Sequence, residues 1–333
     1  MPPVERHPAP EAPADRTEAR FDWEIWGVAA AIVVDDPAAL AAARRLADSE
    51  LAAATAVCSR FEPDSELSRA NSGPRPADGI PVSPLFAEYL ETALAVAADT
   101  DGAVDPTLGA DLEALGYDRD FARLPAPAGL PASDGAEHVT IAVRPRVSGW
   151  YRTRLEGGRL HLPPGLRLDL GASAKAHAAD RIAHLVADAT GTSVLVSLGG
   201  DLATAGSSRR RWEVLVQDRP EDPAQQVSIP NGSAIATSST RKRRWRSGGG
   251  TVHHILDPRL GSPVDARWRS VTVAARRCVT ANALSTAAIV RGPSAVGWLS
   301  SRGADARLVT IEGDVVRTGA WPRETRVDEV RHG

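Results

Sequence analysis

The chain has 333 residues, 43% of them hydrophobic, and a formal net charge of −3 at pH 7. This length supports one large core or two modest ones, and the slightly acidic balance argues against a general nucleic-acid binder. No apolar run approaches the roughly 20 residues that cross a bilayer, and the N-terminus has no apolar signal segment, so we expect no membrane span and a cytoplasmic location.

The two ends of the chain differ in composition from its middle. Residues 1–20 are rich in proline and charge and predict a disordered tail, and residues 323–333 are charged and predict a frayed end. Residues 21–322 are expected to form one domain. Cys58 and Cys278 lie far apart in apolar segments, which favours buried free thiols over a disulfide.

The first half of the chain predicts a strand and two long helices. The apolar run at 24–34 predicts a buried strand. Asp36-Pro37 and Ser83-Pro84 each place an N-cap before a proline, so helices are expected to about Ser59 and Thr100. The remaining segments are a polar stretch at 61–71, a turn with a short helix at 101–117, a loop at 124–137 and hairpin-like strands at 138–162.

The second half mixes helices and strands without regular alternation. Alternating leucines at 166–170 predict a strand. Helices are expected at 172–189, at 278–291 and from Pro293. Strands are expected at 193–201, near 212–217, 226–229, 233–237 and 251–256, and at 268–275 and 307–312. This order favours an α+β fold with mixed or antiparallel sheets and packed helices.

Lys175 occupies the first turn of a helix that follows a strand and a small-residue turn. Unpaired backbone N–H groups and the positive end of the helix dipole favour anions at such a place. Only two of the 39 basic residues are lysine, the other being Lys242. In a chain so biased to arginine, this lysine suggests a need for a compact ammonium group, although a chance surface lysine is an equally good interpretation of the local pattern.

Several other turns and helix positions carry polar side chains. Asn282 and Thr286 are four residues apart and share a helix face, where an amide oxygen and a hydroxyl suit a hard cation such as Mg²⁺. Alone, they are more typical of surface polar residues. The basic stretch 241–246, RKRRWR, is the best nucleic-acid feature, but its alternation favours an exposed edge strand. Turns that combine small and acidic residues occur at 105–107, 169–175, 199–201, 237–239 and 254–258.

Taken together and in order, these segments resemble the ApbE-like FAD:protein FMN transferase family. The resemblance covers about residues 24–312. It is carried by FEPDSELSRAN, AVDPTLG, DLGASAKAHAAD, LVSLGGDLATAG, AIATSS, HHILDPRLGSPV and ANALSTA. It implies a single catalytic unit with an ApbE-like, T-fold-like architecture.

The resemblance also implies an activity: Mg²⁺-dependent transfer of the FMN half of FAD to a Thr or Ser hydroxyl of a target protein, with release of AMP. Lys175 and, as a proton acceptor or orienting residue, His254 are expected to be catalytic. The residues expected to contact FAD are Trp26, Phe61, Ala103, Val104, Asp105, Asp169, Lys175 and Leu256. The carbonyl of Ala172 and the side chains of Asn282 and Thr286 are expected to hold the metal. The expected partner is a flavinylation target with an FMN-type acceptor sequence, and the enzyme is expected to be a monomer or homodimer.

The chain departs from the family pattern at several positions. The family usually offers Asp where this chain has Asn282, which keeps an oxygen ligand but loses a negative charge. Trp26 replaces a methionine, Ala176-His177 replaces Gly-Tyr, and Ser239 replaces a glycine. Two alternatives therefore stay open beside the transferase: an FAD-binding pseudoenzyme and an FAD pyrophosphatase that uses water as the acceptor.

Overall fold

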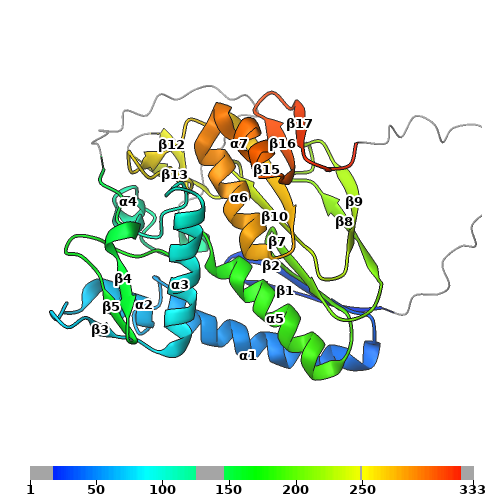
Figure 1. Cartoon of the computed structure of the whole chain (residues 1–333), viewed down its shortest axis with the longest axis horizontal. Coiled ribbons are helices and arrows are strands. Elements are labelled where there is room, and N and C mark those ends of the chain that lie inside the picture. The colour runs from blue at the N-terminus through cyan, green and yellow to red at the C-terminus, as the bar shows by residue number, and fades with distance from the viewer. Residues whose placement is uncertain (1–17, 125–145, 248–249, 324–333) are drawn as a thin grey trace, which may run out of the picture.

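The computed structural model describes residues 18–124, 146–247 and 250–323. Its centre is an eight-stranded sheet in the order β1-β2-β6-β7-β10-β15-β16-β17 (Figure 1). Every neighbouring pair in this sheet is antiparallel. The strands are β1 Ala19–Ile25, β2 Val28–Val34, β6 Val194–Leu198, β7 Asp201–Ala205, β10 Ala234–Ser239, β15 Trp268–Ala275, β16 Asp305–Thr310 and β17 Val315–Thr318.

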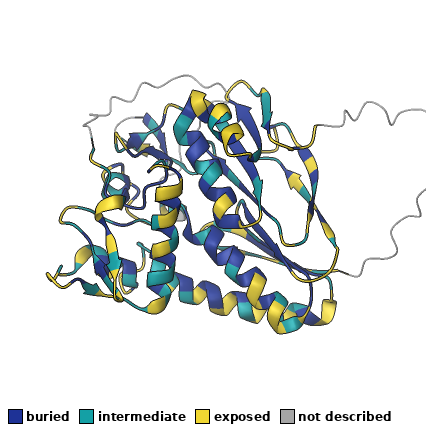
Figure 2. Ribbon diagram, in the orientation of Figure 1, coloured by how far each residue is buried: buried dark blue, intermediate teal, exposed yellow. Residues whose placement is uncertain are grey.

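Helices pack on one face of this sheet, and a hairpin covers part of the other. The helices of the chain are α1 Leu40–Cys58, α2 Glu66–Ser72, α3 Pro84–Asp99, α4 Gly109–Ala114, α5 Ala174–Thr190, α6 Cys278–Arg291 and α7 Ala295–Ser301. α5 contacts β6 and β7, α6 contacts β10 and β15, and α1 packs against α5. In Figure 2 the central strands and much of α5 and α6 are buried, whereas α1 carries many exposed positions.

Strand periodicity divides the sheet residues between these two faces. Ile32 and Val196 point into the core beneath the helices. Their neighbours Val33 and Leu195 point to the opposite face. There they meet Trp212 of the hairpin formed by β8 (Arg211–Val216) and β9 (Gln225–Pro230). Because both faces are covered, the strands β2 and β6 are apolar at nearly every position.

Three small sheets flank the large one. β3 (Ile80–Pro81), β5 (Arg159–His161) and β4 (Arg154–Glu156) form the first. β11 (Arg244–Ser247) pairs with β12 (Gly250–His253), and β13 (Leu256–Asp257) pairs with β14 (Ser262–Pro263). Tyr117, Trp245 and Leu256 share a small core that connects these two hairpins to α4.

The prediction of one strand over 24–34 is wrong. The segment is a hairpin in which Ile25 pairs with Val28 across a two-residue turn. Trp26 and Gly27 both have positive φ, at 52° and 67°, as the two-residue turns that match strand twist require. Tryptophan rarely adopts this conformation, so within the turn only Gly27 hints at it from the sequence.

The α+β prediction is confirmed, and the predicted long helices correspond to α1, α3, α5 and α6. The strands β7 and β17 and the short helix α2 were not predicted. The 124–137 loop lies almost entirely, and the 138–162 strands lie partly, outside the described residues. The same holds for most of both predicted tails, although Ala19 and Arg20 belong to β1. Cys58 and Cys278 are free thiols, half-buried and buried respectively, and no helix in the described ranges has the length and apolarity of a membrane span.

Candidate functional site

A cavity of about 730 Å³ opens between the helical layer, the β1–β2 turn and the β11–β14 region. Every predicted site residue lines it: Trp26, Phe61, Ala103, Val104, Asp105, Asp169, Ala172, Lys175, His254, Leu256, Asn282 and Thr286. Cavities of this size suit a ligand of nucleotide or dinucleotide size. The structure thus brings together residues that are widely separated in the sequence, while their roles stay predictions.

Lys175 lies in the first turn of α5 and is mostly buried. Its Nζ donates to the carbonyl of Gly171 at 3.2 Å and lies 3.6 Å from Oδ2 of Asp201. Burial lowers the pKa of Lys175, and the Asp201 carboxylate opposes this shift. The predicted ammonium group is therefore held between a turn carbonyl and a buried carboxylate at the cavity wall.

Asp180, one helical turn beyond Lys175, fixes α5 against α6. Its two carboxylate oxygens accept hydrogen bonds from the backbone N–H groups of Cys278 and Val279, at 2.7 and 3.1 Å. A side chain of α5 thus caps the first turn of α6, satisfying donors that a helix cannot satisfy itself. Because of this cap, Lys175 on α5 and Asn282 on α6 keep a defined relative position.

Asn282 and Thr286 present oxygen atoms from α6. Asn282 donates its Nδ2 to Oδ1 of Asp201 at 2.9 Å, and its own Oδ1 is buried without a hydrogen-bond partner in the described part of the chain. Thr286 Oγ1 lies 2.7 Å from Oγ of Ser238. A buried polar atom without a partner costs about 1–3 kcal/mol, so this oxygen calls for a ligand.

The donor set fits a hard cation. Amide, hydroxyl and carbonyl oxygens are the groups that Mg²⁺ accepts, and the described residues contain no cluster of three or more His, Cys, Asp or Glu that would suit a softer metal. Ala172 lines the same cavity and could offer its backbone carbonyl. Asn282, Thr286 and Ala172 are therefore suitable Mg²⁺ ligands.

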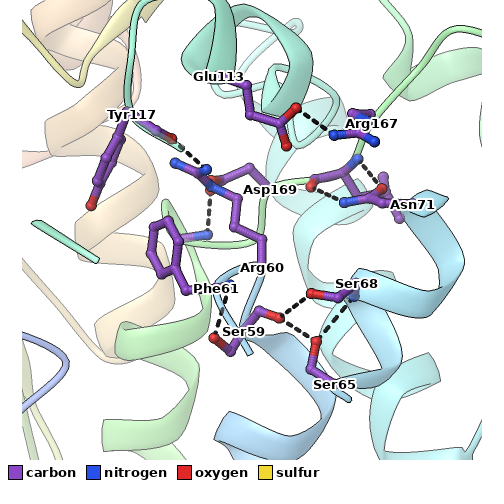
Figure 3. A network of polar contacts seen from close by, with 12 residues as sticks. Ser59, Arg60, Phe61, Ser65, Ser68, Asn71, Glu113, Tyr117, Arg167 and Asp169 are labelled. Carbon is purple, nitrogen blue, oxygen red and sulfur yellow. Dashed lines mark hydrogen bonds and ion pairs between the residues drawn. The ribbon is translucent and has the colours of Figure 1, made fainter. Parts of the chain in front are cut away.

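Arg60 organises the part of the cavity wall that also contains Phe61, Tyr117 and Asp169 (Figure 3). Its Nε donates to Oδ2 of Asp169 at 2.5 Å and its Nη1 to the carbonyl of Tyr117 at 2.5 Å. The guanidinium group stacks on the rings of Phe61 and Tyr117, 4.3 and 4.6 Å from their centroids. Only 5% of the side chain is exposed, and Nη2 has no hydrogen-bond partner in the described ranges.

The motif FEPDSELSRAN builds the support behind this wall. Ser65 caps α2 by accepting from the N–H of Ser68 at 3.0 Å, and Glu66 accepts from the backbone and hydroxyl of Ser83, which caps α3. Asn71 pairs with the backbone of Leu168 through two hydrogen bonds, of 2.9 and 2.7 Å, visible in Figure 3. The motif thus holds the segment that carries Asp169.

Asp105 lines the cavity, but its carboxylate is engaged in holding other segments. Oδ1 accepts from the N–H and hydroxyl of Thr107, and Oδ2 accepts from Ser148 at 2.6 Å and from Arg146 at 3.2 Å. The side chain has no exposed surface. We infer that any contact of Asp105 with a ligand comes from its backbone, and that its carboxylate anchors residues 146–149.

His254 lies half-buried at the cavity. Burial, Arg243 and Lys175 all lower its pKa well below 6.5, and a hydrogen bond to the backbone of Arg243 only partly opposes them. Its Nδ1 is buried without a partner in the resolved ranges of the structure. The imidazole is therefore neutral at pH 7, with a ring nitrogen free to accept a proton.

The segment RKRRWR forms part of the same site. It enters the edge hairpin β11–β12, and Trp245 is buried with its Nε1 donating to the carbonyl of Leu115 at 2.6 Å. Because this tryptophan is buried, it cannot stack on bases, which argues against the interpretation of RKRRWR as a nucleic-acid-binding segment. Arg243 of this segment lines the cavity.

Arg60, Tyr117 and Arg243 line the cavity, but no sequence pattern indicates them as site residues. The only sequence signal for Arg60 was its position directly before FEPDSELSRAN. Asp201 and Ser238 were noted only as turn residues, although both line the cavity.

Comparisons with known proteins find relatives that match most of the chain. The sequence pattern of the ApbE family matches residues 25–323. The FAD:protein FMN transferase of Escherichia coli (strain K12) is 29% identical over 285 residues, covering 83% of this chain and 78% of that protein. The FAD:protein FMN transferase of Treponema pallidum (strain Nichols) is 32% identical over 252 residues, covering 71% and 67%.

Two solved structures share the fold. The ApbE protein from Thermotoga maritima superposes with a TM-score of 0.76 at 26% identity and covers 91% of this chain and 97% of its own. The apo form of Pseudomonas stutzeri flavinyl transferase ApbE superposes with a TM-score of 0.72 at 24% identity, covering 91% and 94%.

Proposed function

This chain belongs to the ApbE family, and we propose that it is an FAD:protein FMN transferase, as its curated relatives are named. The single observation that carries this proposal is the shared cavity. Lys175 at the start of α5 and Asn282 and Thr286 of α6 line one space of about 730 Å³. A dinucleotide whose two phosphates lie between the ammonium group of Lys175 and a cation held by α6 would engage both parts of this cavity.

The walls of the cavity supply the groups that FAD binding needs. Trp26 and Phe61 offer aromatic surface for the flavin or adenine ring. The Trp26 indole is fixed by a hydrogen bond from its Nε1 to Oγ1 of Thr55, at 2.8 Å. Arg60 and Arg243 add two guanidinium groups to the ammonium group of Lys175, so the negative charge of the pyrophosphate is met by several cations.

We propose that Asn282 Oδ1, Thr286 Oγ1 and the carbonyl of Ala172 hold Mg²⁺. When bound, the ion would neutralise charge on the pyrophosphate and on the leaving group. None of these three ligands carries a charge, whereas Mg²⁺ sites usually include one or two carboxylates. The affinity for the ion is therefore expected to depend on the phosphates of FAD and on nearby protein charges.

The chemistry is a phosphoryl substitution. The hydroxyl oxygen of the acceptor Thr or Ser attacks the phosphorus on the FMN side, the bond from that phosphorus to the bridging oxygen breaks, and AMP leaves with that oxygen. The neutral imidazole of His254 accepts the hydroxyl proton. Lys175 stabilises the charge that develops on the phosphate oxygens, and the fixed walls keep attacking and leaving oxygens in line.

The test is incubation of the purified protein with FAD, MgCl₂ and a protein that carries the sequence Asp-x-x-(Ser/Thr/Gly)-Ala-Thr. We expect flavin fluorescence on the acceptor band in a denaturing gel and one AMP released per flavin transferred. An acceptor whose final Thr is replaced by Val is the control and is expected to stay unlabelled.

Two other outcomes would replace the proposal. FAD binding that ignores Mg²⁺ and releases no AMP would identify a flavin-binding pseudoenzyme. Free FMN and AMP formed without any acceptor protein would identify a pyrophosphatase.

A further inference from the structure

Asp201 is a buried carboxylate at the boundary between the two halves of the site. It is the first residue of β7 and follows the Gly199-Gly200 turn, in which Gly199 has a φ of 75°. A side chain on Gly200 would meet the carbonyl of Thr237 at 3.1 Å, so the turn packs closely against β10. Only 4% of the Asp201 side chain is exposed.

The two oxygens of this carboxylate have different partners. Oδ1 accepts from Nδ2 of Asn282 at 2.9 Å, and Oδ2 lies 3.6 Å from Nζ of Lys175. Asp201 therefore contacts both the helix that carries the ammonium group and the helix that carries the metal ligands. It was singled out in the sequence only as part of a double-glycine turn.

An ionised carboxylate accepts hydrogen bonds but cannot donate one. The carboxamide of Asn282 must therefore turn its NH₂ group toward Asp201, and its Oδ1 must point elsewhere. That Oδ1 is the buried oxygen without a partner in the described part of the chain. The orientation that makes Asn282 a possible metal ligand thus follows from the chemistry of its neighbour.

We propose that Asp201 is the positioning residue that makes Asn282 a Mg²⁺ ligand. It fixes the carboxamide with the oxygen toward the ion, and it supplies beside the ligand the negative charge that an asparagine lacks. A carboxylate hydrogen-bonded to a ligand also polarises that ligand, as supporting groups around metal sites commonly do. This inference rests on the proposed function of the cavity.

A cycle of three variants tests the coupling between the two residues. Asp201→Asn removes the charge and can present either end of its amide to Asn282. Asn282→Asp gives a ligand whose two oxygens need no orientation. The third variant, Asp201→Asn/Asn282→Asp, exchanges the two groups. Mg²⁺ affinity is measured by calorimetric titration of MgCl₂ into metal-stripped protein with FAD bound and no acceptor protein.

In the native background, Asp201→Asn is expected to weaken Mg²⁺ binding about 10- to 100-fold. In the Asn282→Asp background, Asp201→Asn is expected to weaken Mg²⁺ binding less than about 3-fold. A carboxylate at position 282 supplies the negative charge itself, and its two equivalent oxygens need no orienting partner. This dependence on background separates positioning from a general loss of structure. If Asp201→Asn alone does not fold, comparing Asn282→Asp with the double variant still applies.

The inference is overturned if Asp201→Asn folds and binds Mg²⁺ as tightly as the native protein, or if it weakens binding equally in both backgrounds. It is also overturned if the double variant binds the ion as weakly as Asp201→Asn. FMN transfer by the native protein is measured in parallel. If the native protein transfers FMN but the cycle shows no coupling, the proposed function stands and only the role of Asp201 is rejected. If the native protein neither binds Mg²⁺ nor transfers FMN, both proposals are rejected.

Discussion

Two walls of the cavity differ in the kind of atom that they leave without a partner. The arginine wall consists of Arg60, Phe61, Tyr117 and Asp169, and the amide wall consists of Asp201, Ser238, Asn282 and Thr286. Within the residues that the structure describes, the buried atom without a partner on the arginine wall is a donor, Nη2 of Arg60. On the amide wall, within the same residues, it is an acceptor, Oδ1 of Asn282.

This difference teaches which ligand the cavity suits. A lone donor favours an anion or another acceptor, and a lone acceptor favours a cation or a hydrogen-bond donor. A dinucleotide with a bound divalent ion offers both an anion and a cation. The arginine wall is also tied into the fold through Asp169 and Tyr117, whereas the amide wall leaves Asn282 Oδ1 without a partner among the described residues, so substitutions in the two walls should affect different properties.

The largest expected effect is at His254, which lines the same cavity. His254→Ala removes the proton acceptor and should lower kcat for FMN transfer by about 10²- to 10⁴-fold with little change in FAD affinity. The matched control is His253→Gln. His253 contacts the carbonyl of Val264 and the N–H of Ile255 and does not line the cavity, so this variant should keep its kcat. An unchanged kcat in His254→Ala would remove this residue from the mechanism.

Arg60→Met tests the structural character of the arginine wall. It leaves the half-buried Asp169 carboxylate without the guanidinium group and the Tyr117 carbonyl without its donor, which should together cost about 3–5 kcal/mol of the free energy of unfolding and lower Tm by about 5–8 °C. Arg119→Met is the control, because the Arg119–Asp118 pair is exposed and should leave Tm unchanged. Thermal unfolding followed by circular dichroism measures both. Equal Tm values for Arg60→Met and the native protein would show that the wall is not structural.

Thr286→Val tests the amide wall and should show the opposite profile. Valine has nearly the shape of threonine but no ligand oxygen, so transfer should fall about 100-fold, or about 2.7 kcal/mol in the barrier, with a change in Tm of only a few degrees. Ser285→Ala is the matched control, because Ser285 bonds the same Ser238 hydroxyl at 2.8 Å but does not line the cavity. If both variants lose transfer equally, the hydroxyl cluster is structural and Thr286 is not a ligand.

The sequence predicted two residues of each wall, Asn282 and Thr286 of the amide wall and Phe61 and Asp169 of the arginine wall. Asn282 and Thr286 stand on one helix face, so helical periodicity alone brings them together. Lys175 was accessible because the turn and the helix start around it are local features, although the strand predicted at 166–170 is only an isolated bridge between Arg167 and Leu108. Arg60 was not accessible, since its partners Asp169 and Tyr117 come from distant segments, and no local pattern separates a buried arginine from the many exposed ones.

The fold, like the site, could be predicted only where the signals are local in the sequence. The predicted helices are marked by local signals such as Ser83-Pro84, which caps α3 as expected. The β1–β2 turn was missed because Trp26 adopts a conformation that tertiary contacts impose, including its hydrogen bond to Thr55. The strand β7 was missed because its five residues, DLATA, are all buried on both faces and show no alternation.

The smallest expected effect is a shift in the pH dependence of FMN transfer when Arg243 is replaced. The positive charge of Arg243 lowers the pKa of His254, so the native enzyme should keep its proton acceptor neutral at pH 6.5 and lose transfer only at lower pH. Arg243→Gln removes that charge, which raises the pKa of His254 and should move the acid limb of the kcat/KM profile to higher pH. Arg246→Gln, an exposed position on the same segment, should leave the limb in place. Because the acid limb of kcat/KM reports the free enzyme, a weaker FAD affinity in Arg243→Gln changes its height and not its position. A limb that stays fixed in Arg243→Gln would mean that a different group accepts the proton.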